Sequence, residues 1–291
     1  MDITNLTANT TFDPDEEVYL DHVNMYTIPL VVLCILAAVA DCLIIYVILK
    51  YDEMRTHVNL YLLNWCISNL LVLPIVPVSM NVSVIGFISE EVLCLMFESL
   101  LVVMSGNLLF VAVTLVDWYL MTYGTQNCFI KFKKSAVFVC FTVWIVILAF
   151  GFLSVSLCLH DISFPLSAIM FLLTYFFVFV TIILIHVLRL VKKNFSNVVM
   201  EKDIFILKLV SWYFLAWLLN WFLLFGQIII RRTHMSLEYF SFYLGFSYPL
   251  IMLYLLYHDD KTFKKCFRHM CGHKDEPDDQ NNRDNFVTVL L

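Results

Sequence analysis

A few polar side chains interrupt long apolar stretches of this chain, and they are the first candidates for chemistry. Asp41 brings a carboxyl group into one stretch, Asn69 and Asn107 bring amides into two others, and Tyr248 brings a phenol into the last. Oxygen atoms of these types can hold a hard cation such as sodium. The same groups can form hydrogen bonds between helices. Packing, a switch element and a sodium-sensitive site are therefore three open interpretations of this polar cluster.

Composition indicates what surrounds these residues. Of the 291 residues, 61% are hydrophobic and 14% are charged, with a mean hydropathy of +0.84. A soluble domain is about half apolar and about a quarter charged, which argues against a soluble enzyme and against a disordered chain. The net charge of −6 argues against a nucleic-acid partner. The apolar stretches contain no nucleophile–base pair or metal-ligand grouping, so we expect no enzyme, cofactor or metal centre.

Seven apolar runs are each long enough to cross a bilayer, which takes about 20 residues in a helix. They cover residues 28–49, 58–80, 92–116, 136–157, 164–188, 209–230 and 239–257. Continuous apolar character favours helices over the alternating strands of a membrane barrel. The sequence predicts an all-α membrane protein, a seven-transmembrane helix bundle over residues 28–257.

The basic residues predict how this bundle is oriented. Sixteen of the eighteen Lys and Arg residues fall in segments on one side of the membrane, and Arg231 and Arg232 fall on the other. Basic residues concentrate on the cytoplasmic side, so we expect the N-terminus outside and the C-terminus inside. With about 1.5 Å of rise per residue, the four polar cluster residues then lie at similar depths, about 12–17 Å from the inner helix ends.

Short motifs along the chain occur in the order found in rhodopsin-like G protein-coupled receptors. They are Asp117-Trp118-Tyr119 at the place of Asp-Arg-Tyr, Trp144 in the fourth run, Phe214 to Leu219 at the place of Phe-x-Cys-Trp-x-Pro, and Tyr248-Pro249 at the place of Asn-Pro. Residues 28–271 resemble that family, closest to its peptide and chemokine receptors. The resemblance implies a multi-pass receptor of the plasma membrane that signals to a heterotrimeric G protein. It also implies that residues 258–271 form a short amphipathic eighth helix.

The departures from the family motifs concern the inner face. Trp118 replaces the family's arginine, Leu219 replaces its proline in the sixth helix, and Tyr248 replaces its asparagine in the seventh. The resemblance assigns Asp117, Trp118 and Tyr119 to the G protein interface. A tryptophan cannot supply the positive charge of the missing arginine. Altered or ligand-independent coupling and loss of coupling both remain open.

The predicted outer face is acidic and carries two cysteines. Cys94 and Cys158 are the cysteines at predicted outer helix ends, and an oxidising environment should pair them. Residues 1–27 form an acidic extracellular tail, and the outer face as a whole has ten acidic residues against two arginines. This charge favours a cationic ligand such as a basic peptide. The predicted ligand-binding residues are Glu98, Leu101, Trp217, Trp221, Arg231 and Arg232, although Glu98 pairing with one of the arginines is an equal alternative.

Several modification sites follow from short patterns. The sequons predict glycosylation at Asn5, Asn9 and Asn81, all on the expected outer side. Tyr19 lies among acidic residues, which fits tyrosine sulfation or simply a solvated acidic tail. Cys266 and Cys271 are placed for palmitoylation beside the membrane lipids. Residues 272–291 are polar and charged, and we expect a disordered cytoplasmic tail.

The sequence favours an orphan-like receptor that changes shape when its ligand binds, with a second receptor as a conceivable dimer partner. A non-signalling binder, either a scavenger or a chaperone for another receptor, is the main alternative. The departures at Trp118, Leu219 and Tyr248 motivate it. A transporter fits less well, because the runs lack paired mid-membrane breaks and inverted repeats.

Overall fold

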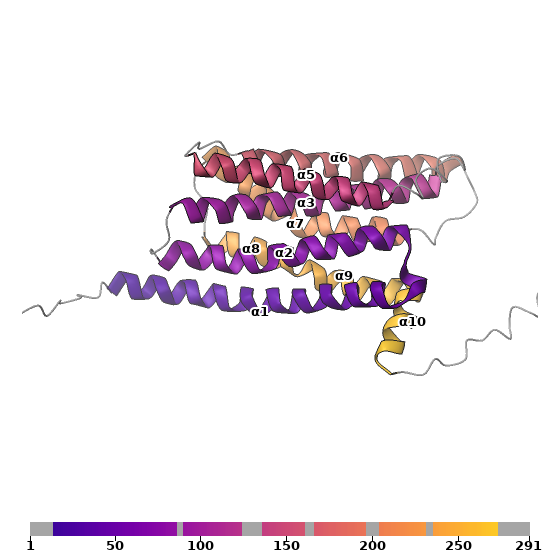
Figure 1. Ribbon diagram of the computed structural model, residues 1–291, viewed down its shortest axis with the longest axis horizontal. Helices are drawn as coiled ribbons and strands as arrows, with labels where there is room; N and C mark the ends of the chain where they lie inside the picture. Colours follow the sequence, from indigo (N-terminus) through magenta and orange to yellow (C-terminus); the bar gives the residue numbers. More distant parts are fainter. Residues whose placement is uncertain are drawn as a thin grey trace, which may run out of the picture.

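The computed structural model describes the backbone of residues 14–85, 90–123, 136–160, 166–195, 204–230 and 235–272, and all regular structure in these ranges is helical. The elements are α1 (Pro14–Lys50), η1 (Asp52–Met54), α2 (His57–Ile85), α3 (Glu90–Tyr123), α5 (Ala136–Leu159), α6 (Leu166–Phe195), α7 (Ile204–Ile230), α8 (Met235–Phe246), α9 (Tyr248–Asp259) and α10 (Lys261–Met270). The expected all-α fold is confirmed in this part of the chain (Figure 1).

Seven helical spans in the described residues are long and apolar enough to cross a membrane. They are Met25–Lys50, His57–Ser79, Glu91–Leu120, Ala136–Leu159, Ala168–Val191, Phe205–Leu223 and Tyr239–Asp259. Each coincides with one of the expected apolar runs, with differences at the ends. This is the architecture of a multi-pass membrane protein.

The first helix begins earlier than the sequence predicts. α1 begins at Pro14, whereas the predicted boundary between an acidic tail and the first span lies after residue 27. Proline is well placed in the first turn of a helix, because its fixed φ suits the helix and the first N–H groups have no partner there. Asp15, Glu16 and Glu17 follow in that turn, where acidic side chains stabilise the positive end of the helix dipole. The acidic segment therefore continues the helix instead of ending before it.

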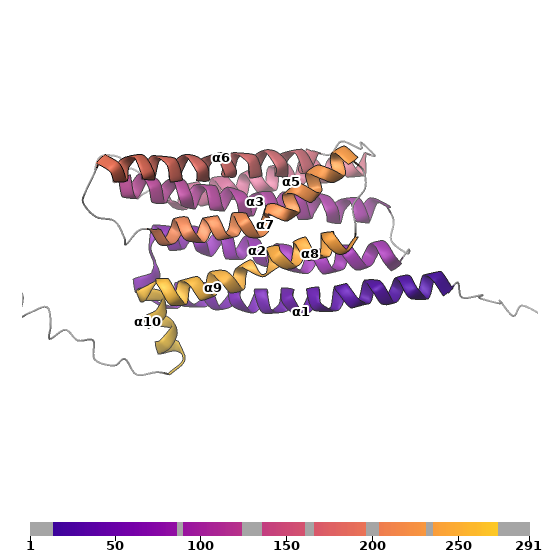
Figure 2. The same ribbon diagram turned by 180° about the vertical axis from the view of Figure 1, so that it is seen from behind.

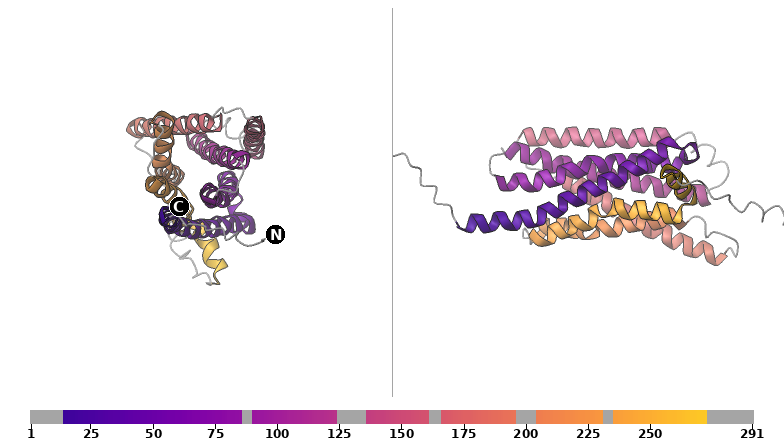
Figure 3. Two further views of the ribbon diagram at one scale, coloured as in Figure 1. Left: turned by 90° about the vertical axis from the view of Figure 1, so that its left-hand side faces the viewer. Right: turned by 90° about the horizontal axis from the view of Figure 1, so that it is seen from below.

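The long helices lie side by side and enclose α3 (Figures 1 and 2). α3 packs on α2, α5, α6 and α7, and 72% of its apolar stretch is buried, against 22% for α5. Viewed end-on, α1 and α6 lie on opposite sides of the bundle (Figure 3, left). α3 is therefore the central helix and α5 a peripheral one. The polar residues Ser105, Asn107, Thr114 and Asp117 of α3 are buried within the protein.

The two ends of the bundle differ in what they carry. A disulfide between Cys94 and Cys158 joins the beginning of α3 to the end of α5, and we call this the disulfide end. The other end carries η1 and α10, and we call it the α10 end. α10 turns away from the bundle and runs across the direction of the long helices (Figure 1).

A break at Ser247 divides the seventh span into α8 and α9. Pro249 follows in the first turn of α9 and has no N–H to donate to the carbonyl one turn before it. Ser247 keeps helical backbone angles and donates its N–H to the Tyr243 carbonyl at 3.0 Å. The span therefore continues across the break in nearly the same direction, with one backbone hydrogen bond missing.

α10 has its own start signal and apolar side. The Asp260 carboxylate accepts hydrogen bonds from the backbone N–H groups of Thr262 and Phe263 at 2.9 and 3.1 Å, which is an N-cap. Phe263 and Cys266 are buried, and Phe267 lies edge-on to Tyr257 of α9. The segment predicted over residues 258–271 therefore contains a helix that packs its apolar side on the end of the bundle.

Candidate functional site

Three of the predicted polar cluster residues form a hydrogen-bonded chain across α1, α2 and α3. The amide of Asn107 donates to the Asn69 side-chain oxygen at 3.0 Å, and the amide of Asn69 donates to the Asp41 carboxylate at 3.1 Å. All three residues are buried, with exposed fractions of 2% or less. Asn69 occupies the centre, because it both accepts from one neighbour and donates to the other. Their similar depth, expected from residue counting, thus coincides with direct contact.

This chain leaves acceptor atoms open. Oδ1 of Asp41 and Oδ1 of Asn107 are buried and have no hydrogen-bond partner among the described residues, and the same holds for Oγ of Ser68 on α2. Cys66, one turn before Asn69, is fully buried with its thiol facing the Asp41 carboxyl. A buried polar atom without a partner is costly. These open acceptors are the atoms that a proton, a water molecule or a small cation would contact at this site.

Tyr248, the fourth predicted member, turns to a different helix. Its hydroxyl donates to the backbone carbonyl of Leu209 on α7 at 3.0 Å. Its ring stacks on Trp65 of α2, with 5.4 Å between centroids, and meets Tyr213 of α7 at 4.9 Å. Trp65 and Tyr213 also meet edge-on at 4.8 Å. We call Trp65, Tyr213 and Tyr248 the aromatic triad; it joins α2, α7 and α9 and was not expected from the sequence.

The predicted disulfide is present and joins the beginning of α3 to the end of α5. The Cα atoms of Cys94 and Cys158 are 6.0 Å apart, within the usual range for a disulfide. Glu98 lies one turn further along α3 and is half-buried. Its Oε2 is buried and has no hydrogen-bond partner among the described residues. A carboxylate with an open acceptor at a membrane protein's end favours a cationic partner.

The other predicted ligand-binding residues lie at different depths. Leu101 is buried in α3 with an exposed fraction of 4%. Trp221 stacks between Tyr175 of α6 and Phe225, with centroid distances of 5.2 and 5.8 Å, and its indole N–H has no partner among the described residues. Arg231 and Arg232 lie outside the described residues. The structure therefore provides an aromatic stack on α6 and α7 but leaves the expected arginine contacts open.

Trp217 occupies a tight contact between α7 and α8. It is 3% exposed and meets Phe246 edge-on at 5.2 Å. A Cβ atom at Gly245 would lie 2.7 Å from its ring, so the glycine permits the close approach of the two helices. Trp217 is therefore part of the packed core in this conformation instead of lining an opening.

The residues predicted for the G protein interface are mostly enclosed at the α10 end of α3. Asp117 is 3% exposed and lies near Tyr61 of α2 and Cys140 of α5. Trp118 is 6% exposed and belongs to the hydrophobic core, and Tyr119 is half-buried. A partner could reach Trp118 only after neighbouring helices separate.

The predicted modification sites are distributed as follows. Tyr19 falls within α1 and Asn81 within α2, but their side chains lie outside the described part of the structure. Asn5 and Asn9 lie outside the described residues altogether, as do residues 273–291 of the predicted tail. Cys266 is buried against the bundle, whereas Cys271 is exposed just after α10. Of the two predicted acylation sites, Cys271 alone presents its thiol at the surface.

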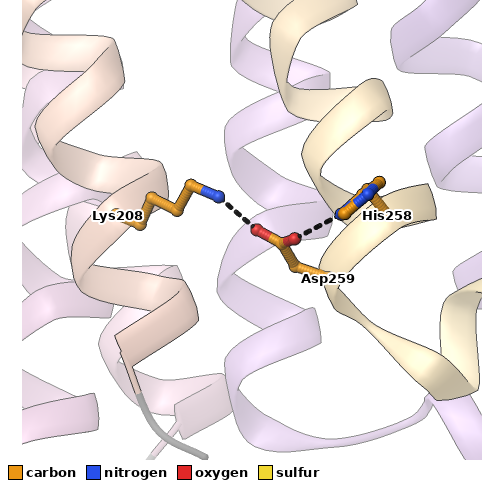
Figure 4. Close-up of polar contacts among 3 residues, drawn as sticks. All are labelled: Lys208, His258 and Asp259. Atoms are coloured by element: carbon orange, nitrogen blue, oxygen red, sulfur yellow. Dashed lines mark hydrogen bonds and ion pairs between the residues drawn. The ribbon is translucent and has the colours of Figure 1, made fainter. Parts of the chain in front are cut away.

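An ion-pair cluster at the α10 end was not predicted. Nζ of Lys208 on α7 lies 2.6 Å from Oδ2 of Asp259 at the end of α9. Nδ1 of His258 lies 2.8 Å from the other oxygen of the same carboxylate (Figure 4). The sequence carries a signal for this pair, because Lys208 directly precedes one apolar run and Asp259 closely follows the next. Antiparallel neighbouring helices bring such positions together.

The sequence matches no protein-family model and no curated protein. The candidate sites therefore rest on the chain's own residues and their geometry.

Proposed function

We propose that this chain is a cell-surface receptor of the rhodopsin-like type, which binds an extracellular ligand and passes a conformational change to a cytoplasmic partner. The observation that carries the proposal is the Cys94–Cys158 disulfide at one end of a bundle of seven spans. A disulfide persists in an oxidising compartment, which supports an outward-facing position for the disulfide end in this proposal. The ordered motifs of the sequence agree with this assignment.

The charge distribution supports the same orientation. The α10 end of the bundle carries the basic residues Lys50, Arg55, Lys208, Lys265 and Arg268. Basic residues concentrate on the cytoplasmic side of membrane proteins. The α10 end is accordingly the inner end in this proposal, with the N-terminus and the disulfide outside.

The ligand in this proposal is cationic. Glu98 supplies a carboxylate with an open buried oxygen close to the disulfide, and the acidic residues of the N-terminal segment would attract positive charge. A basic peptide fits both features. The aromatic stack around Trp221 would add a surface for apolar or cationic side chains.

On the inner side, α10 would lie along the membrane surface. Its apolar side, with Phe263 and Phe267, packs on the end of the bundle, and Cys271 stands exposed beyond the end of α10. An acyl chain on Cys271 would insert into the leaflet beside α10. G protein coupling would require Trp118 to become accessible, because it is enclosed in the core.

The enclosure of Trp118 favours a second candidate, a non-signalling binder. No positive charge stands at this position, and the indole packs with the hydrophobic core. A scavenger or a chaperone for another receptor needs the outer site without a responsive inner face. The two candidates differ in whether the inner face recruits a partner.

The test displays the full chain on cells, measures binding of secreted basic peptides, and records Gα recruitment by energy transfer. Glu98→Gln should weaken binding about 10-fold or more, because a hydrogen bond to a charged group contributes about 1.5–3 kcal/mol. Glu91→Gln is the matched control, since Glu91 is exposed on the same helix and should change affinity little. Equal effects of both variants, or no binding of any cationic peptide, would overturn the proposed ligand class. Binding without Gα recruitment, in wild type and in Trp118→Arg, would establish the non-signalling binder.

A further inference from the structure

The ion pair of Lys208 and Asp259 joins two membrane-spanning helices at the α10 end. Lys208 lies in the second turn of α7, and Asp259 is the last residue of α9. Their side chains are 43% and 23% exposed. The contact is therefore reachable by water and by a partner, unlike the contacts deeper in the bundle.

The carboxylate of Asp259 is oriented by a second group. Its Oδ1 is held by Nδ1 of His258 at 2.8 Å, which leaves Oδ2 directed at Lys208 (Figure 4). The His258 ring in turn stacks on Tyr254, one turn earlier in α9, at 5.8 Å. Both oxygens of one carboxylate are thus occupied, and the rotamer that reaches α7 is supported from α9 itself.

The same two helices are also joined by buried contacts, which begin one residue further along α7. Tyr248 of α9 donates to the carbonyl of Leu209 on α7, and its ring packs on Tyr213. Tyr213 and Tyr248 are 3% and 0% exposed. Breaking these contacts would leave aromatic surface and the Tyr248 hydroxyl without their partners. Breaking the ion pair would instead let water hydrate the charged groups of Lys208 and Asp259, which are already partly exposed.

Because its contact with α9 is the more exposed one, the beginning of α7 should be easier to displace than the part that packs on the aromatic triad. α7 contains no proline, so it has no built-in kink of the kind proline produces. A displacement of its first turns would turn the helix about the aromatic triad. On its other side, Ser211 shares a hydrogen bond of 3.2 Å with His186 of α6, between partly buried groups. Further along α7, the hydroxyl of Tyr175 on α6 donates to the Phe214 carbonyl at 2.9 Å.

We propose that Lys208 and Asp259, with His258 as the positioning residue, form a latch that holds the inner end of α7 on α9 and opens this end of the bundle when it breaks. A partner of the inner face would favour the broken state by contacting the surfaces that separate. That last step rests on the proposed receptor function. The latch itself does not, because it is a property of the unliganded chain.

The experiment measures amide hydrogen exchange in the full chain, reconstituted in lipid nanodiscs without ligand or partner. Lys208→Met and Asp259→Asn should each raise exchange over residues 208–212 by about two- to five-fold, the range expected for a partly exposed ion pair. The double variant should exchange no faster than the faster single variant, because both remove one interaction. The charge swap, Lys208→Asp with Asp259→Lys, should restore slow exchange.

Asp260→Asn is the matched control. It removes a neighbouring carboxylate of the same charge, while asparagine still caps α10, so exchange over residues 208–212 should stay at the wild-type level. His258→Ala should raise exchange over residues 208–212 by part of the increase seen with Asp259→Asn. Ser211→Ala should raise it by less than His258→Ala does. Wild-type exchange in both single variants, additive exchange in the double neutral variant, or an equal rise in Asp260→Asn would each overturn the latch. A chain that binds no peptide but shows the expected pattern would keep the latch and reject the receptor proposal.

Discussion

The two sides of the bundle are held by different kinds of contact. Where α1, α2 and α3 meet, the chain from Asp41 through Asn69 to Asn107 is buried, with open acceptors and no water-exposed member. Where α7 meets α9, the contacts grade from the buried aromatic triad to the partly exposed pair of Lys208 and Asp259. In the first region all three residues are buried. In the second region the aromatic triad is buried and the ion pair is partly exposed.

This difference indicates which region fixes the fold and which can change. Removing one partner of a buried charged or amide contact leaves another group unsatisfied in a low-dielectric environment. A partly exposed ion pair is replaced by water at little cost. We therefore infer that α1, α2 and α3 form the constant part of the bundle and that the α10 end of α7 is its adjustable part.

The largest effect should come from exchanging residue types in the polar chain. Asn69→Asp places a second carboxyl opposite Asp41 and should destabilise the fold by about 3 kcal/mol or more, because like or unpaired charges in the interior are costly. Asp41→Asn alone should cost less, about 1 kcal/mol, the scale of an interhelical hydrogen bond in membranes. Thermal unfolding in detergent measures both.

The double variant Asp41→Asn with Asn69→Asp sharpens the result. The amide introduced at position 41 can donate to the carboxylate introduced at position 69, and Asn107 can donate to that carboxylate as before. Its unfolding temperature should lie well above that of Asn69→Asp. If the double variant is as unstable as Asn69→Asp, the hydrogen-bonded chain does not organise this region.

An intermediate effect is expected for a glycine on the other side of the bundle. The Cβ of Gly245→Ala would lie 2.7–2.8 Å from the rigid indole of Trp217, and overpacking of this kind costs about 1–3 kcal/mol. Gly151→Ala is the control, because its Cβ would meet Cγ1 of Val102 at 3.7 Å, an ordinary van der Waals contact. Unfolding temperatures should fall for Gly245→Ala and change little for Gly151→Ala; the reverse order would contradict the tight α7–α8 contact.

The smallest effect should come from Tyr248→Phe. The change removes the hydrogen bond to Leu209 but keeps the ring contacts with Trp65 and Tyr213, so we expect a loss of about 0.6 kcal/mol, typical of such bonds in membranes. Tyr248→Leu should cost more, because it also removes the aromatic contacts. Reversible unfolding in mixed micelles measures the free energy of unfolding of both variants. Equal losses in Tyr248→Phe and Tyr248→Leu would show that the ring of Tyr248 contributes nothing beyond its hydroxyl.

Much of the framework could be predicted because it depends on local properties of the chain. Apolar runs of about 20 residues identify spans without knowledge of their neighbours. Cys94 and Cys158 could be paired because their positions at helix ends on one side follow from the same count. The start of α1 was missed, since an acidic segment was interpreted as a tail although Pro14 and the acids after it are favourable at a helix N-terminus.

The candidate sites were only partly predictable from residue counts. Counting rise per residue puts Asp41, Asn69, Asn107 and Tyr248 at one depth, but depth does not say which way each helix is rotated. Rotation brings the first three into contact and turns Tyr248 toward α7. The burial of Trp118 likewise depends on which face of α3 meets the core.

The amino-acid order by itself determined that seven spans are long and apolar enough to cross a membrane, which ends carry the basic residues, and which cysteines can pair. Bilayer thickness and charge act on each segment separately. Only the tertiary structure decided that Asn69 bridges two helices, that Trp65, Tyr213 and Tyr248 form a triad, and that Lys208 reaches Asp259. These contacts depend on the rotation and crossing of helices that are distant in sequence, and packing of the whole bundle sets both.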